Sequence, residues 1–468
     1  MDIHIVAGKL EEQVDDVLVR FGEGKASEVL IEPAPVGSEA RFLLTIGLGE
    51  EAKVDLEVIR EATGVALASA RGLKISSMSM ALPSLDEFPV DELAQAVHEA
   101  LLLATYSYNE FKKMSEAKLK LSSINLIVDR KQLATATKGF NRAGVLISGV
   151  SLARDLVNQP PNNLHPEALV DVARKIAKNS HDQISVKILD EAACAKLGMG
   201  SYLAVGAGSE FPSKFIHLTY TPKNKSKQSF AIVGKGITFD SGGLSLKPAD
   251  AMMTMKCDMG GAAAVLGLFS VMTDLAPKVT VHGIIAAAEN MPSGKAMRPG
   301  DIVTAMNGKT IEILNTDAEG RLTLADALCY AVTLEPTAVV DLATLTGACV
   351  VALGEEIAGL MSTDEDLAVD LLAAADRAGE KLWEMPLPPR YRSLIESDVA
   401  DLRNIATSRY GGSLTAGLFL QEFVGTTPWA HLDIAGPAFA ERPMSSYLGK
   451  GGTGYAVRTL AEWLSQLR

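Results

Sequence analysis

Four short segments of the sequence are almost continuously apolar, and they limit the possible folds more than any other feature. They cover residues 230–234, 279–286, 338–342 and 431–434. Strands buried on both faces of a sheet have this composition, whereas strands with one face in water alternate apolar and polar residues. Helix-like segments at 262–275 and 322–334 lie between them. This alternation predicts an α/β fold in which a mostly parallel, mixed sheet is flanked by helices.

The first 140 residues repeat the same alternation on a smaller scale. Segments 41–47 and 121–128 are rich in apolar and β-branched residues, which is typical of strands. Segments 56–73 and 90–106 carry apolar residues at the spacing of one helix face. We therefore predict a small N-terminal α/β domain at residues 1–140.

A helical pattern then runs from about residue 139 to 157 and ends at Asn158-Gln159-Pro160-Pro161-Asn162-Asn163. Two adjacent prolines among amide side chains stop a helix. We predict a linking helix at 141–157, followed by a larger C-terminal domain at 158–468. A length of 468 residues agrees with two or three domains.

The composition excludes several classes of protein. The formal net charge is −13, which argues against nucleic acid as the main partner, because phosphate binding needs clustered Lys and Arg. The four cysteines form no C-x-x-C pair, as expected in a reducing compartment. Neither a signal-peptide pattern nor a long uncharged apolar run is visible, so we expect no membrane span. These features predict a soluble cytoplasmic protein.

The segment 315–322, Asn-Thr-Asp-Ala-Glu-Gly-Arg-Leu, places two carboxylates two positions apart between a strand-like and a helix-like segment. On an extended backbone, Asp317 and Glu319 would point the same way and converge. Converging carboxylates repel each other unless a cation lies between them, which suggests a divalent metal. Acids before a helix also serve as caps, and this segment alone leaves both interpretations open.

Two further segments of this domain combine acids with glycines. Residues 233–248 hold Lys235, Asp240, Lys247 and four glycines directly after an apolar strand. A phosphate-binding loop is one interpretation, but the pattern G-x-x-x-x-G-K-[ST] is absent. Residues 255–261 hold Asp258 before two glycines, where a helix cap is the simpler interpretation.

Taken together, three aspartates and one glutamate beside strands of one domain exceed what capping requires. Four neighbouring carboxylates would be strongly destabilising without two divalent ions. The seven histidines show no metal-binding spacing, so we expect them to be structural. An oxygen-rich site suits manganese or magnesium as well as zinc.

The segment 315–322 resembles the signature of the leucyl aminopeptidase family, the cytosolic di-metal aminopeptidases. Four more segments resemble the family in the same order along the chain: 233–247, 255–261, 341–348 and 411–416. The resemblance extends from Leu156 to the C-terminus, and it implies that residues 158–468 form the catalytic domain. The first 140 residues carry no matching motif.

The resemblance implies a role for each matching residue. The implied metal ligands are Lys235, Asp240, Asp258, Asp317 and Glu319, of which Asp240 and Glu319 bridge two ions and Asp317 binds only the exchangeable one. The implied catalytic residues are Lys247, which polarises the scissile carbonyl, and Arg321, which holds a bicarbonate ion as general base. The implied substrate-binding residues are Met255, Asp258, Thr344, Leu345 and Gly347.

The family resemblance thus implies a metallo-aminopeptidase that releases the N-terminal residue, preferably a leucine-like one, from peptides with a free N-terminus. It implies a two-metal hydroxide mechanism with manganese or zinc, and a homohexamer. Two alternatives remain. Some relatives bind DNA or act as regulators, but the negative net charge of this chain argues against that as its main role. A metal-dependent phosphatase is possible because two-metal sites also serve phosphoryl transfer.

Overall fold

The computed structural model describes residues 1–13, 15–113, 121–224 and 226–467. Its contacts divide the chain into two compact units. The smaller unit comprises Met1–Ser148 and Arg442–Lys450, and the larger unit comprises Gly149–Glu441 and Gly451–Arg468. The division at residue 148 falls inside α3 (Leu133–Asn158), the helix that contains the predicted linking segment.

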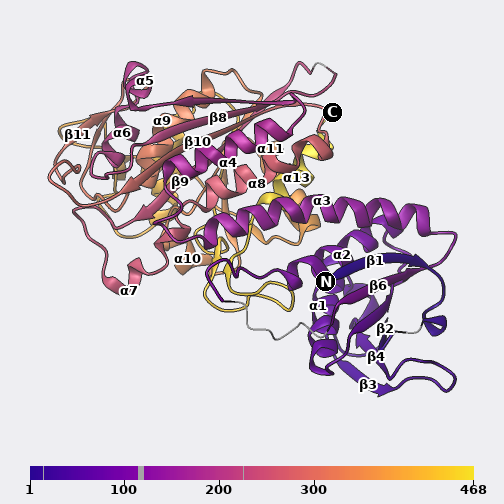
Figure 1. Cartoon of the computed structure of the whole chain (residues 1–468). Helices are drawn as coiled ribbons and strands as arrows, with labels where there is room; N and C mark the ends of the chain where they lie inside the picture. The colour runs from indigo at the N-terminus through magenta and orange to yellow at the C-terminus, as the bar shows by residue number, and fades with distance from the viewer. Residues whose placement is uncertain (14, 114–120, 225, 468) are drawn as a thin grey trace. The chain divides into compact units, whose positions relative to one another are not determined.

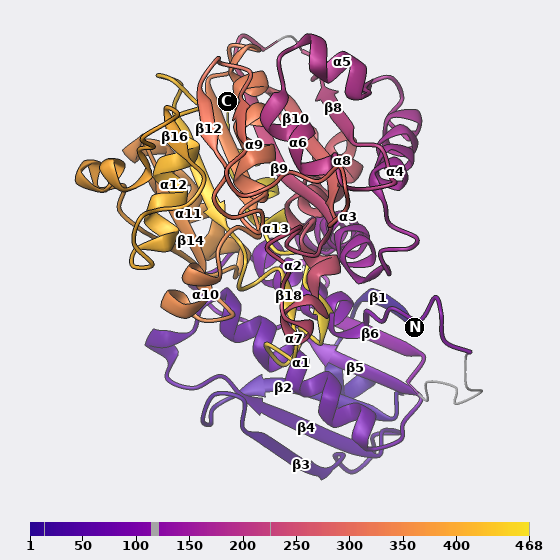
Figure 2. The same cartoon turned by 90° about the vertical axis from the view of Figure 1, so that its left-hand side faces the viewer.

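The smaller unit is built on a six-stranded sheet with the order β1-β6-β5-β2-β4-β3. In that order the strands are Asp2–Ala7, Ser123–Val128, Ser77–Ala81, Val17–Gly22, Phe42–Gly47 and Val29–Pro33. Every pairing is parallel except that of β3 with β4, and Figure 2 shows β2, β4 and β3 side by side. The helices α1 (Leu56–Gly72) and α2 (Val90–Thr105) bury their apolar faces in the core of this unit. The predicted α/β character is confirmed.

The segment Arg442–Lys450 belongs to the smaller unit although its flanking residues belong to the larger one. Ser446 donates its backbone N–H to Glu61 Oε2 (3.0 Å) and its hydroxyl to the Glu61 carbonyl (2.8 Å). Tyr447 donates its hydroxyl to Glu57 Oε1 (2.6 Å). Gly64 allows this close approach, because a Cβ there would lie 2.3 Å from Ser446 Oγ.

The larger unit is built on an eight-stranded mixed sheet with the order β15-β14-β17-β13-β9-β10-β8-β7. In that order the strands are Leu382–Glu384, Ala358–Ser362, Trp429–Asp433, Ala338–Ala343, Ser229–Asp240, Thr280–Asn290, Lys214–Tyr220 and Ile184–Leu189. The central strands β17, β13, β9 and β10 are parallel to one another, and β14, β8 and β7 are joined by antiparallel pairings. The predicted mixed sheet flanked by helices is confirmed.

Helices cover both faces of this sheet. The helix α9 (Gly320–Val332) packs with α6 (Gly200–Gly206) and α12 (Gly412–Gln421) in the apolar core on one face. The helix α8 (Gly260–Leu275) lies on the other face, where Phe269 fills the space beside Gly283 of β10. Figure 1 shows α8 near α13 (Val457–Gln466). The segment Ala249–Leu275 is apolar enough to cross a membrane, but 83% of its most apolar window is buried, as in a core helix.

The carboxyl ends of the parallel strands define one edge of the sheet. At this edge β9 extends further than the sequence analysis predicted. The prediction ended the strand at residue 234, but β9 continues to Asp240. It continues because β10 pairs with it along nearly its whole length, up to Asn290 opposite Asp240. Lys235 and Asp240 therefore lie on the strand itself.

Candidate metal centre

The five predicted metal ligands come from three places at this edge of the sheet. Lys235 and Asp240 lie on β9. Asp258 follows the short 3₁₀ helix η3 (Met255–Cys257) and precedes α8. Asp317 and Glu319 precede α9 on a turn, with Glu319 in the αR region. The extended backbone expected for these two acids was therefore wrong, although their side chains do converge.

Three carboxylates meet in the first part of the site. Asp240, Asp317 and Glu319 each offer one oxygen, and these three atoms lie within 4.8 Å of one another. Lys247 Nζ lies 2.9 Å from Asp240 Oδ2 and 2.5 Å from Asp317 Oδ1. The site thus gathers residues from the strand end, the glycine-rich loop and the turn before α9.

Lys235 occupies the second part of the site and is almost wholly buried. Its Nζ lies 2.7 Å from Asp258 Oδ1 and 3.0 Å from Glu319 Oε1, and it donates to the Thr344 carbonyl at 2.9 Å. Thr344 also donates its hydroxyl to Asp258 Oδ1 at 2.7 Å. The next residue after Glu319 must be small, because a Cβ on Gly320 would lie 2.4 Å from Lys235 Cε.

Burial and neighbouring charges both shift the pKa values of these groups. Burial raises the pKa of Glu319 to about 8 and that of Asp258 to about 6, with Asp240 adding to both shifts and Lys235 opposing them. Burial would lower the pKa of Lys235, but Asp258, Glu319 and Asp240 raise it above its ordinary value. Fully ionised, four carboxylates against two lysines would carry a formal charge of −2, and the raised pKa values of Glu319 and Asp258 reflect the cost of that charge when no cation offsets it.

The donor set fits divalent cations. Glu319 Oε2 and Asp258 Oδ2 are buried and accept no hydrogen bond within the described chain. Glu319 stands at the N-cap position of α9, but its side chain makes no capping hydrogen bond. Asp258 bonds to Lys235 and Thr344 rather than to the start of α8. These carboxylates are therefore better placed to bind a metal ion than to cap a helix. Their negative charge also argues against a phosphate bound among them.

Arg321, the predicted bicarbonate-binding residue, is buried at the start of α9. Its Nη1 donates to the Asn404 carbonyl at 2.8 Å, whereas its Nε has no hydrogen-bond partner in the part of the chain that is described. Burial lowers the pKa of this guanidinium to about 10, while Glu319 and Asp433 act in the opposite direction. Arg321 therefore remains charged at neutral pH.

The predicted substrate-binding residues differ in how closely they contact the acids of the site. Thr344 contacts Asp258 directly, and the neighbouring Leu345 donates its backbone N–H to Asp433 Oδ1 at 3.2 Å. Gly347 begins α10 (Gly347–Leu353), and Met255 is half-buried in η3. Met255 reaches the site only through its backbone carbonyl, which accepts the Asp258 N–H at 3.4 Å. Among the described residues, no side-chain hydrogen bond joins Met255, Leu345 or Gly347 to the four carboxylates of the predicted metal ligands.

Three residues that support the site were missed by the sequence analysis. Asn290 donates to Asp240 Oδ1 at 2.8 Å and to the Thr316 carbonyl at 3.0 Å. The Asn404 carbonyl accepts a hydrogen bond from Arg321, and the Asp433 carboxylate accepts one from the backbone N–H of Leu345, just after β13. Asn290 and Asp433 each end a parallel strand at the same sheet edge as Asp240, which is the signal that could have identified them.

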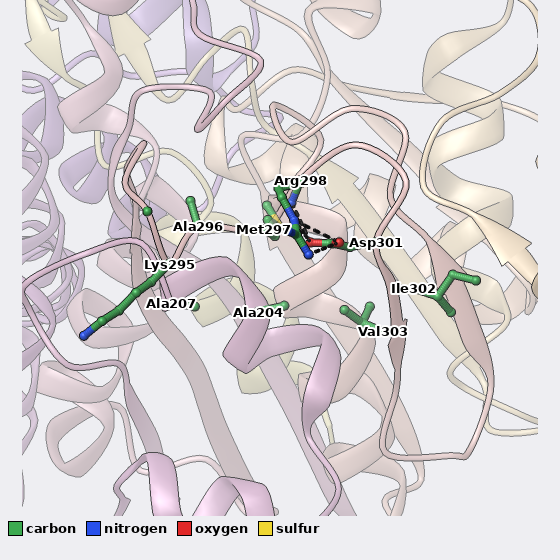
Figure 3. A pocket seen from close by; sticks show the side chains of 10 residues that line it. Ala204, Ala207, Lys295, Ala296, Met297, Arg298, Asp301, Ile302 and Val303 are labelled. Atoms are coloured by element: carbon green, nitrogen blue, oxygen red, sulfur yellow. Dashed lines mark hydrogen bonds and ion pairs between the residues drawn. The ribbon is translucent and has the colours of Figure 1, made fainter.

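A separate cavity of about 410 Å³ lies elsewhere in the larger unit. It is lined by Ala204, Ala207, Gly294, Lys295, Ala296, Met297, Arg298, Asp301, Ile302 and Val303. Figure 3 shows Arg298 and Asp301 paired within it, so that their charges offset each other. None of its lining residues belongs to the acidic site.

Comparison with known proteins agrees with this geometry. Residues 151–461 match the catalytic domain of the cytosol aminopeptidase family, and residues 8–115 match the N-terminal domain of that family. Probable cytosol aminopeptidases of Rippkaea orientalis and Thermosynechococcus vestitus are each 48% identical to the chain. The first alignment covers 98% of this chain and 92% of the relative, and the second covers 96% and 90%.

Solved structures give the same result. The bottromycin maturation enzyme BotP in complex with Mn is 35% identical, with a TM-score of 0.87 over 96% of this chain and 99% of that one. A tomato leucine aminopeptidase mutant is 36% identical, with a TM-score of 0.88 over 100% of this chain and 96% of that one. The resemblance inferred from the motifs is confirmed. The chain belongs to the cytosol aminopeptidase family and is a metallo-aminopeptidase.

Proposed function

We propose that this enzyme releases N-terminal, leucine-like residues from peptides with the help of two divalent ions, manganese or zinc. The observation that carries the proposal is the convergence of Asp240, Asp317 and Glu319 within 4.8 Å beside two lysines. The ions would be held by Lys235, Asp240, Asp258, Asp317 and Glu319. When bound, two such ions activate water at neutral pH and polarise the carbonyl that it attacks. The similarity to a manganese complex and to a leucine aminopeptidase supports this choice of metal and substrate.

Lys247 supplies positive charge in this proposal. Burial would lower its pKa, but Asp240 and Asp317 raise it above the ordinary value, so the ammonium group persists at neutral pH. Its side chain is 14% exposed, which leaves one side open to a substrate. An ammonium aimed at the carbonyl oxygen stabilises the negative charge that develops there in the transition state.

Arg321 holds the general base in this proposal. Its Nε–H is buried and without a partner in the described chain, and its charge persists at neutral pH. A planar guanidinium with parallel donors matches the oxygens of a bicarbonate ion better than a lysine does. Arg321 would hold the ion, which would supply general-base chemistry beside the leaving amine. No histidine or free carboxylate is needed for that task.

Asp258 restricts the reaction to the end of a peptide. Its Oδ2 is buried and accepts no hydrogen bond within the described chain, so it can accept one from the substrate's α-amino group. Thr344 holds the other carboxylate oxygen in place. Met255, Leu345 and Gly347 would line the site for the first side chain, and their apolar character favours a leucine-like residue.

The proposed setting is a cytoplasmic homohexamer that acts on peptides with a free N-terminus. The name of the family and the reduced cysteines support the cytoplasm. A net charge of −13 gives no support for a nucleic-acid partner.

A substrate comparison tests the proposal. Protein stripped of metal and reloaded with manganese or zinc should hydrolyse L-leucine p-nitroanilide much faster than L-glutamate p-nitroanilide. It should leave p-nitrophenyl phosphate intact. Hydrolysis of the phosphate ester in preference to the anilides would reject the aminopeptidase proposal and favour a phosphatase.

A further inference from the structure

Three polar side chains meet on one face of the larger unit's sheet, outside the acidic site. The strands β8 and β10 are antiparallel neighbours (Figure 1). Their register places Thr219 directly opposite His282. His217 precedes Thr219 by two residues, so both side chains leave the same face of β8. The sheet itself therefore brings two imidazoles and one hydroxyl together.

The three donor atoms form a nearly equilateral triangle. His217 Nε2 lies 3.0 Å from His282 Nδ1, and Thr219 Oγ1 lies 3.1 Å and 3.3 Å from these two atoms. Ligand atoms that surround one ion at about 2.1 Å are roughly 2.9–3.4 Å apart, from octahedral to tetrahedral geometry. The triangle thus has the size of one face of a metal coordination sphere.

The surroundings keep imidazole lone pairs available. Burial, together with His282 and Lys187, lowers the pKa of His217 to about 4, and burial also lowers the pKa of His282. Tyr330 Oη lies 3.1 Å from His217 Nδ1. When Nδ1 donates its proton to Tyr330, Nε2 carries a lone pair that faces His282, which is the usual arrangement around a metal-binding histidine.

One nearby charge opposes a cation. Lys187 of β7 lies opposite His217, and its Nζ lies 5.9 Å from the centre of the Tyr330 ring. Lys187 is exposed, so water and salt screen its charge, and its side chain can turn away from the triangle. With no carboxylate in the triangle, the ligands favour ions that prefer imidazole, such as zinc, nickel and copper, over manganese.

We propose that His217, Thr219 and His282 bind one additional divalent cation of this imidazole-preferring class. The site shares no ligand with the acidic centre. His282 and Asn290 lie eight residues apart on β10, a distance of about 26 Å along the strand. The proposal therefore goes beyond the proposed peptidase function.

Zinc stoichiometry tests this proposal on the whole enzyme. Equilibrium dialysis against excess zinc should give one more ion per chain for the wild type than for His282→Gln. Glutamine can still donate a hydrogen bond to His217 Nε2 but is a poor zinc ligand. His4→Gln, which alters an exposed histidine of the smaller unit, should bind as much zinc as the wild type. Lys187→Gln should lower the zinc concentration that half-fills the additional site.

Equal zinc contents in the wild type and His282→Gln would overturn the proposal and leave the triangle as a hydrogen-bond network. Anomalous diffraction from zinc-soaked wild-type crystals provides a second test that needs no variant. A peak between His217 and His282 is expected, and its absence at saturating zinc would also overturn the proposal. Hydrolysis of L-leucine p-nitroanilide by His282→Gln should equal that of the wild type, which separates this site from the catalytic one.

Discussion

At the scale of single residues, the two lysines of the centre have different surroundings, and this difference separates their proposed roles. Lys235 is enclosed by Asp258, Glu319 and the Thr344 carbonyl, so it has no open side from which to reach a substrate. Lys247 lies between Asp240 and Asp317 and remains partly exposed. We therefore assign Lys235 to the metals and Lys247 to the substrate carbonyl.

The variant Lys247→Met should lose about 100-fold or more in kcat while retaining both metals. Methionine keeps the aliphatic bulk and removes the charge that is proposed to stabilise the transition state. Steady-state kinetics and elemental analysis of the same preparation measure the two properties. Loss of metal in parallel with activity would make Lys247 a ligand and contradict the assignment.

The variant Arg321→Ala should stay folded, keep its metals and lose most of kcat. The rate of the wild type in carbonate-depleted buffer should rise when bicarbonate is added, whereas the rate of the variant should not. Melting temperatures of both proteins provide the control, because a purely structural arginine would instead give an unstable variant. A wild type that does not respond to bicarbonate would remove this ion from the proposed mechanism.

The acidic residues of the centre were predictable, but some of their partners were not. Asp240, Asp258, Asp317 and Glu319 stand out because four acids in glycine-containing segments of one domain exceed what helix capping requires. Asn290 was missed because the predicted strand ended at residue 286, four residues short of it. An amide after a run of alanines carries no signal until the pairing of β10 with β9 is known.

At the scale of elements, the type of each major helix and strand was easier to predict than its length. The apolar runs at 338–342 and 431–434 correspond to β13 and β17, with shifts of one or two residues. The strand β9 extends six residues beyond its prediction because β10 continues to pair with it past Gly234. Tertiary pairing of this kind overrides the local preference of glycine-rich sequence for loops.

The helix α1 offers a prediction about close packing. The variant Gly64→Ala should destabilise the smaller unit by about 1–3 kcal/mol, because its Cβ would overlap Ser446. The matched control is Gly72→Ala in the same helix, where a Cβ meets no atom within 4 Å and should be neutral or slightly stabilising. Chemical unfolding of the three proteins gives the comparison. Equal stability of the two variants would show that Ser446 does not pack against Gly64.

At the scale of the whole molecule, all proposed metal ligands belong to the larger unit. The three tryptophans, Trp383, Trp429 and Trp463, also belong to it. Tryptophan fluorescence should therefore report a higher melting temperature when manganese is added. Ions at about a thousand times their dissociation constant contribute about 4 kcal/mol per site. The variant Asp317→Ala should show a smaller rise, and an unchanged melting temperature of the wild type would contradict metal binding by the folded larger unit.

The central claim is that the acidic centre needs two ions per chain for peptide hydrolysis. It is tested most directly by titrating manganese into metal-free protein while L-leucine p-nitroanilide hydrolysis and bound metal are measured together. We predict no activity without metal, a maximum at two bound ions per chain, and an inactive Asp317→Ala variant that retains one. Full activity in metal-free protein, or an active Asp317→Ala variant that binds both ions, would contradict the claim.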